Sequence, residues 1–175
     1  MRRLAEAERI HKFMRALGAA ARDEARVYFT GGASAVLLGW RATTVDVDLA
    51  IVPDRDELLR ALPALKIDLA LNIELASPAD FIPELPGWED RSVFIAREGK
   101  VTFYHYDFNA QALSKIERGH TQDLADVDEM LNRGLVEPRT LRRLFEEIVT
   151  RLHRYPAVDP NSFRRALDEA LAGRR

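Results

Sequence analysis

The sequence predicts an α+β fold, in which a small mixed β-sheet is flanked by helices and followed by a helical C-terminal extension. Three observations lead to this prediction. Short runs with the two-residue alternation of strands occur only before residue 109, a Glu-Gly turn joins two of them into a hairpin, and helical periodicity dominates from residue 110 onward. We expect two regions: residues 1–109, with an N-terminal helix and the sheet, and residues 110–175, a helical region packed on that core.

The first part of the chain is expected to alternate helices with short strands. Apolar residues at helical spacing predict an amphipathic helix over residues 3–22. The stretch "RVYFTGG" is typical of a buried strand that ends in a turn, and a small apolar helix over residues 33–40 follows. The stretch "VDVDLAIV" is β-branched and alternating, and Pro53 with Asp54 marks the start of the next helix.

The second part begins with another short strand, "NIELAS", and a proline-rich loop. The stretch "RSVFIAREGKVTFYHYDF" then predicts a hairpin around the turn Glu98-Gly99. Alternation in its second strand is expected to place four residues on one face: Val101, Phe103, His105 and Asp107. The remaining chain has four helical patterns separated by turn residues.

The composition excludes several classes of protein. The 175 residues are 47% hydrophobic, which suffices for a core, and the chain has no cysteine, so disulfide and thiolate chemistry are excluded. No apolar run is long enough to span a membrane, and we expect a cytoplasmic protein. Of the 28 Asp and Glu residues, 18 lie between residues 44 and 130, beside only 8 of the 26 Lys and Arg residues. An acidic middle between basic ends is consistent with a metal site beside a surface for a polyanion.

The strongest chemical signal is the pair Asp46 and Asp48 in an otherwise apolar strand. Residues i and i+2 of a strand point to the same side, with Cα atoms roughly 7 Å apart. Two adjacent carboxylates repel each other and resist desolvation, and a divalent cation is the usual compensation. Pairing with Arg41 or with solvent at the strand end is the alternative.

A glycine pair, Gly31 and Gly32, precedes these acids at the junction between a strand and a helix. Backbone N–H groups at such a junction can face an anion with no side chain in the way. Ser34, in the first turn, is expected to add a hydroxyl donor. Donors for phosphates followed by a metal-binding pair indicate a site for a nucleoside triphosphate.

The stretch "GGASAVLLGWRATTVDVDLAI" resembles the signature of the polymerase-β-like nucleotidyltransferase superfamily. Its Arg-x-Thr-Thr-x-Asp-x-Asp-Leu spelling is closest to the branch that contains the abortive-infection toxin nucleotidyltransferases and related uncharacterised bacterial proteins. The later stretch "SKIERGHTQDLADV" is also similar to that branch. The resemblance implies a nucleotidyltransferase core that uses Mg²⁺ (or Mn²⁺) and an NTP substrate. The chain differs from the family signature at Ala33, where the family often has a serine after its second glycine.

The resemblance also implies roles for further residues. Arg41, Thr44, Lys115 and Arg118 would contact the nucleotide, and Lys115 and Arg118 share one helix face. The alternative is that these two cations form ion pairs with Glu117, Asp123 or other acids of the middle region. Asp123 and Asp126 could also be present because acids are favourable at the start of a helix.

The family mechanism uses a third acid beside Asp46 and Asp48. Glu74, in the middle of a short apolar strand, is the first choice for this catalytic residue and metal ligand, and Asp107 is the second. Two metals about 4 Å apart would activate the attacking hydroxyl and hold the leaving pyrophosphate.

Several acceptors are consistent with the resemblance. The acceptor hydroxyl could belong to RNA, including tRNA, to a protein or to a small molecule, and the basic C-terminal region favours RNA. The branch suggests a toxin–antitoxin component, for which an antitoxin protein would be a partner. The alternative function is a catalytically silent nucleotidyltransferase fold that serves as a nucleotide-binding or regulatory module.

The aromatic and histidine residues of the hairpin and of the chain after it are candidate base-stacking and zinc-binding groups. Four aromatic residues cover both faces of the second hairpin strand: Phe103, Tyr104, Tyr106 and Phe108. We expect most of them to lie in the core and one ring to be available to stack on a base. His105 and His120 lack the spacing of zinc ligands, so no zinc site is expected.

Overall fold

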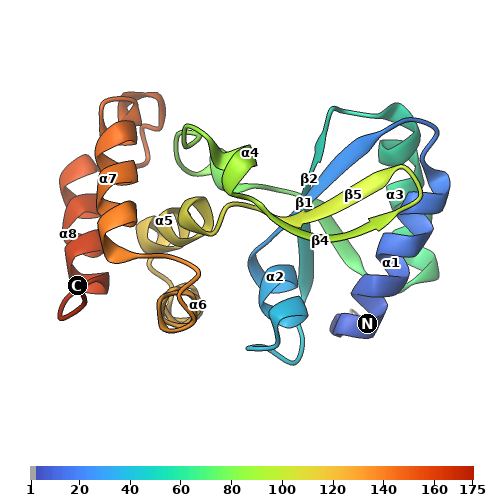
Figure 1. Cartoon of the computed structure of the whole chain (residues 1–175), viewed down its shortest axis with the longest axis horizontal. Coiled ribbons are helices and arrows are strands. Elements are labelled where there is room, and N and C mark those ends of the chain that lie inside the picture. Colours follow the sequence, from blue (N-terminus) through green and yellow to red (C-terminus); the bar gives the residue numbers. More distant parts are fainter. Residues whose placement is uncertain (1–2) are drawn as a thin grey trace. The chain divides into compact units, whose positions relative to one another are not determined.

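Two units, each with its own packed residues, make up the chain (Figure 1). The computed structural model describes residues 3–175, so the first two residues of the expected 1–109 region lie outside it. Unit 1 contains residues 3–77 and 92–106, and unit 2 contains residues 78–91 and 107–175. The α+β prediction is confirmed, because a mixed sheet with helices forms unit 1 and helices form most of unit 2.

The sheet of unit 1 has five strands in the order β3-β2-β1-β5-β4. Their bounds are β1 Ala25–Thr30, β2 Asp46–Val52, β3 Asn72–Leu75, β4 Val93–Glu98 and β5 Val101–His105. The pairs β1–β2 and β4–β5 are antiparallel, whereas β1–β5 and β2–β3 are parallel. The expected hairpin is confirmed as β4–β5. The antiparallel pairing of β1 with β2 matters most for the site, because it places the end of β1 beside the start of β2.

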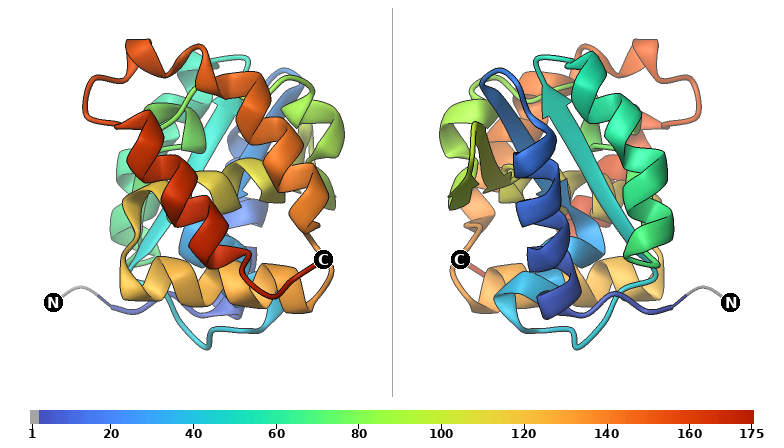
Figure 2. Two further views of the ribbon diagram at one scale, coloured as in Figure 1. Left: turned by 90° about the vertical axis from the view of Figure 1, so that its left-hand side faces the viewer. Right: turned by 90° about the vertical axis from the view of Figure 1, so that its right-hand side faces the viewer.

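Three helices belong to unit 1: α1 Ala7–Ala20, α2 Gly31–Leu38 and α3 Asp56–Asp68. Figure 2 shows α1 and α3 side by side on one face of the sheet. The core of the unit lies on this face, where the rings of Phe13, Phe29 and Phe103 pack together, with centroid separations of 6.3 and 5.7 Å. Val47 and Leu49 of β2 join the same core. The neighbouring residues of β2 therefore point to the opposite face of the sheet.

The first helix begins later than its periodicity predicts. Instead of starting at residue 3, α1 starts at Ala7, because Ala5 pairs with Thr44 in an isolated antiparallel bridge. The N–H of Ala5 donates to the carbonyl of Thr44 (2.7 Å), and the N–H of Thr44 donates back (2.9 Å). Leu4 is consequently 52% exposed and lies outside the core. The bridge attaches the start of the chain to the loop that leads into β2.

Unit 2 is helical. It contains α4 Trp88–Arg91, α5 Phe108–Arg118, α6 Thr121–Asn132, α7 Pro138–Val149 and α8 Pro160–Ala170, with short 3₁₀ helices η1 Pro78–Asp80 and η2 Leu152–Arg154. Leu141, Leu144 and Phe145 of α7 are buried, and Phe145 packs edge-on against Phe163 of α8 (4.9 Å). No helix within residues 3–175 combines the length and hydrophobicity that crossing a bilayer requires.

A backbone contact between α1 and the hairpin turn positions the sheet of unit 1. A Cβ atom on Gly18 would lie 2.4 Å from the carbonyl oxygen of Glu98, and one on Gly99 would lie 2.7 Å from the carbonyl oxygen of Gly18. Gly99 also has a φ of +58°, which disfavours other residues. Only glycine at residue 18 allows this approach of helix and turn.

We therefore expect Gly18→Ala to destabilise the protein, although alanine is the better helix former. The clash with Glu98 should cost about 1–3 kcal/mol, against a gain of at most about 1 kcal/mol from helix propensity. Urea unfolding measures the difference. Ala19→Gly, at an exposed position of the same helix, is the matched control and should cost about 1 kcal/mol. A stabilised Gly18→Ala variant would show that the close approach is not required.

Candidate active site on the second face of the sheet

Asp46 and Asp48 are the first and third residues of β2, and both side chains lie on the face opposite the core. They are partly buried, whereas Val47 and Leu49 are completely buried. The sequence predicted that the two acids share one face, and the alternation of β2 agrees with it. Two carboxylates are thus held side by side at the start of a strand.

The glycine corner adjoins this acid pair. Thr30, the last residue of β1, is paired with Asp48, and Gly31 follows it. A Cβ atom on Gly31 would lie 3.3 Å from Oδ2 of Asp48, and Gly31 has a φ of +58°, a conformation that favours glycine. The backbone of the corner and the carboxylate of Asp48 therefore belong to one surface.

The loop before β2 closes against the second glycine. A Cβ atom on Gly32 would lie 2.0 Å from Oγ1 of Thr44 and 3.3 Å from a guanidinium nitrogen of Arg41. The hydroxyl of Thr44 donates to the carbonyl of Asp46 (3.0 Å). Gly32 is therefore required for close packing of this loop, and Arg41 lies at the corner where phosphates are expected. Arg41 and Thr44 thus lie beside Gly32, and their nucleotide-binding role stays a prediction.

Glu74 lies on the same face as the acid pair. In the parallel pairing of β2 with β3, Asp48 is the partner of Glu74, and Asp46 is the partner of Asn72. The amide nitrogen of Asn72 donates to Oδ1 of Asp46 and to Oε1 of Glu74 (3.1 Å). Asn72 was not among the predicted site residues, although its position two before Glu74 indicates a shared face. It links the carboxylates of two strands.

The donor set fits one type of cation. Among residues 3–175, no group of three or more His, Cys, Asp or Glu side chains is arranged around a common metal position. Asp46 and Asp48 provide two hard oxygen ligands on one surface, next to a corner suited to phosphates. Mg²⁺ is usually bound in this way, by one or two carboxylates with phosphate oxygens and water completing an octahedron. The pair therefore fits Mg²⁺ that arrives with a triphosphate better than a cage made only of protein ligands.

The expectation for Ser34 needs correction. We expected its hydroxyl to face the phosphates, but the side chain is completely buried. The hydroxyl donates to the carbonyl of Phe29 (3.3 Å) and contacts Nδ1 of His105 (2.9 Å). Because α2 begins at Gly31, the first turn directs residue 34 inward onto β1 and β5. Ser34 thus supports the corner from beneath.

Asp107 also differs from its expected place. We expected it on the strand face of His105, but β5 ends at His105, and Asp107 is the N-cap of α5 in unit 2. Its carboxylate is buried, accepts hydrogen bonds from the backbone and side chain of Asn109, and forms an ion pair with Arg91 (2.7 Å). Capping and ion pairing account for an acid at this position.

Lys115 and Arg118 lie in an ion-pair cluster inside unit 2. Nζ of Lys115 donates to Asp123 (3.1 Å) and to Asp126 (2.8 Å), and Arg118 donates to Asp123 (2.9 Å). Lys115 is 3% exposed, so its ammonium is shielded from solvent. The guanidinium of Arg118 also lies 4.7 Å from the ring centre of Phe81. The alternative of ion pairing to Asp123 is therefore what the structure shows, and the contacts join α5 with α6.

Burial of His105 makes stability depend on pH. Desolvation lowers the pKa of His105 from 6.5 to about 4, so the unfolded chain binds a proton in this range that the folded chain does not. The buried, neutral imidazole of His105 therefore stabilises the folded state fully above pH 6.5, and this stabilisation is lost as pH falls toward 4. When pH falls from 7 to 5, the free energy of unfolding measured in urea should decrease by up to about 2 kcal/mol more in wild type than in His105→Gln. Equal losses in the two proteins would contradict this assignment.

Removal of Lys115 should be strongly destabilising. Lys115→Met leaves Asp126 buried without its cation, which should cost about 3–5 kcal/mol in urea unfolding. Adding Asp126→Asn should recover part of that loss. Lys12→Met is the control, because Lys12 forms only an exposed ion pair with Glu8 and should change stability by less than about 1 kcal/mol. A Lys115→Met protein as stable as the control would show that the cluster contributes nothing.

One known protein family matches most of the chain. A family model described as "nucleotidyltransferase of unknown function" (DUF6036) matches residues 6–166, which include both acids, the glycine corner and the ion-pair cluster. The chain matches no curated protein and no solved structure. Since the match extends over most of its length, the chain belongs to this family of nucleotidyltransferases.

Proposed function

We propose that the protein transfers a nucleoside monophosphate from an NTP to an acceptor hydroxyl, with Mg²⁺ (or Mn²⁺) bound at Asp46 and Asp48. The observation that supports this most is the position of Asp48 against Gly31, which joins a cation-binding pair to a phosphate-binding corner. Family membership supports the general activity.

Each part of the site has a distinct task in this reaction. The N–H groups at Gly31 and Gly32 and the guanidinium of Arg41 would bind the β- and γ-phosphates. Thr44 would keep the loop against the corner, and Asn72 would orient the carboxylate of Asp46. When bound, Mg²⁺ would neutralise phosphate charge and favour ionisation of the attacking hydroxyl. Catalysis of this type consists mainly of positioning and electrostatic stabilisation.

The bond changes are those of an in-line displacement. The acceptor oxygen forms a bond to the α-phosphorus, and the bond from that phosphorus to the β-bridging oxygen breaks, so that pyrophosphate leaves with the electron pair. We assign the proton of the acceptor hydroxyl to Glu74, the exposed carboxylate on this face, which would pass it to water. In this assignment Glu74 is the third acid of the reaction.

The setting that we propose is a bacterial cytoplasm, where the protein would act as a toxin–antitoxin component with an antitoxin partner. RNA, including tRNA, is the preferred acceptor class and a protein side chain the second. The absence of cysteine suits a reducing compartment.

A second candidate function is nucleotide binding without transfer. It is favoured by the lack, in the described chain, of three acids around one metal position, and by the burial of Ser34. This candidate predicts that NTP with Mg²⁺ raises the melting temperature while no acceptor becomes labelled. Transfer of label in any acceptor pool excludes it.

Loss of either acid should abolish transfer. Labelled NTPs incubated with the protein, Mg²⁺ or Mn²⁺, and total bacterial RNA or protein should give a labelled acceptor. Asp46→Asn and Asp48→Asn should each lower the rate by at least about a hundredfold, because each removes a ligand of the cation. Asp68→Asn, an exposed acid at the end of α3, should retain the rate. Transfer that persists in both variants would refute the assignment.

A further inference from the structure

The face of the sheet that bears the acid pair also bears aromatic rings. Thr30 is the partner of Asp48, and Tyr28 lies two residues before Thr30, on the same face. Tyr28 is paired with Tyr104 of β5, and Tyr104 is paired with Phe94 of β4. The register thus continues the face of the acids across β1 and β5 to the edge strand.

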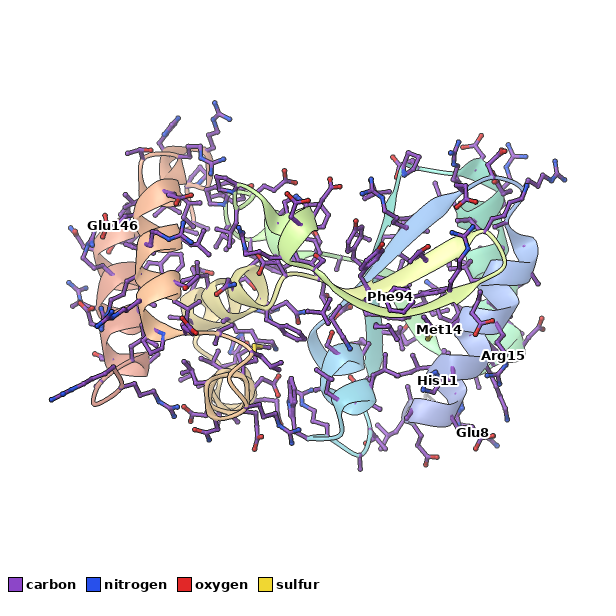
Figure 3. The ribbon with its side chains drawn as sticks, viewed as in Figure 1. Glu8, His11, Met14, Arg15, Phe94 and Glu146 are labelled. Atoms are coloured by element: carbon purple, nitrogen blue, oxygen red, sulfur yellow. The ribbon has the colours of Figure 1, made fainter. Side chains whose placement is uncertain are left out.

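These rings form a connected series that ends in solvent. Tyr28 and Tyr104 stack with ring centres 5.2 Å apart, and Phe94 meets Tyr104 edge-on at 6.2 Å. Tyr28 is buried, Tyr104 is partly exposed, and Phe94, on β4 (Figure 3), is 60% exposed. The buried ring packs against Tyr104, which in turn contacts Phe94. Aromatic rings presented on a sheet face are the usual partners of unpaired nucleobases.

Two arginines continue the same face beyond the rings. Thr102 of β5, two residues before Tyr104, is paired with both Arg26 of β1 and Arg97 of β4. An irregularity in β4 between Phe94 and Ala96 keeps Arg97 on the face of Phe94, although the two positions differ by three, an odd number. Arg97 pairs with Glu24 (2.6 Å), and half or more of each side chain is exposed. A phosphate group can replace such a surface partner readily.

The face therefore has three successive levels along the strands, about 7 Å apart. Asp48 lies at the first level, Tyr104 and Phe94 at the second, and Arg26 and Arg97 at the third. Phe94 lies three strands from Asp48, roughly 16 Å away. This sequence of acid, rings and cations exceeds the extent of one nucleotide and suits a chain of them.

We propose that this face binds the single-stranded 3′ end of an RNA acceptor. Its bases stack on Phe94 and Tyr104, its phosphates contact Arg26 and Arg97, and its terminal hydroxyl reaches Asp48. This inference rests on the proposed function, since the terminal oxygen is the one that bonds to the α-phosphorus while pyrophosphate departs and Glu74 takes the proton. It assigns the rings and the arginines to the acceptor and leaves the glycine corner to the NTP.

The test measures strand binding and nucleotide binding separately in the full chain. The probe for the strand is a 5′-fluorescein-labelled, unstructured RNA oligonucleotide of about ten residues, followed by anisotropy. Phe94→Leu keeps an apolar side chain and removes the ring, and should raise Kd between about fivefold and a hundredfold. Phe94→Trp keeps a ring and should bind as wild type does. Arg97→Gln should reduce the magnitude of the slope of log K against log salt by about one, as expected for the loss of one phosphate contact.

The nucleotide measurement separates the two sites. The increase in melting temperature caused by NTP with Mg²⁺ should be equal in wild type and Phe94→Leu. Failure of wild type to bind the oligonucleotide, or equal Kd values for Phe94→Leu and wild type, would overturn the inference. A loss confined to NTP binding would also overturn it, because the ring would then contact the nucleotide.

The strand-binding inference and the proposed transfer reaction can fail separately. If label reaches a protein and Phe94→Leu leaves its rate unchanged, the inference is wrong although the proposed transfer stands. If Phe94→Leu weakens strand binding but no acceptor is ever labelled, the strand site stands and the transfer reaction is refuted.

Discussion

The antiparallel register of β1 and β2 is the constraint on which the rest of the site depends. It pairs Thr30 with Asp48, so the turn at Gly31 and Gly32 falls beside the carboxylates that open β2. A shift by one residue would turn Asp46 and Asp48 into the core and expose Val47 and Leu49. The hydrophobic core therefore fixes the orientation of the acids.

The like charges of Asp46 and Asp48 favour the binding of a cation between them. Two adjacent carboxylates at the start of β2 repel each other. The amide of Asn72 bridges one of them, Asp46, to Glu74. In unit 2, Lys115 neutralises Asp123 and Asp126 directly. The acid pair of β2 lies beside the glycine corner, on a surface suited to a cation and phosphates.

Much of the fold and part of the site could be predicted from the sequence, because they depend on local periodicity. The alternation of β2 determined which residues share a face, and the Glu98-Gly99 turn determined the hairpin. Alternation places Asn72 on the face of Glu74, but its contact with Asp46 depends on the register between β2 and β3 and could not be predicted. The burial of Ser34 and the capping role of Asp107 depend on where α2 and α5 begin, which periodicity determines only within a few residues.

The central claim is that the acids of β2 and the glycine corner bind one cation together with a triphosphate. Paramagnetic Mn²⁺, added with an NTP analogue that cannot be cleaved at the α-phosphorus, tests it directly through broadening of backbone amide signals in NMR spectra. Our account predicts that the signals of Gly31, Gly32, Asp46 and Asp48 broaden first, while that of Gly99 in the distant hairpin turn stays sharp. Broadening centred on any other part of the chain, with these four signals unaffected, would contradict it.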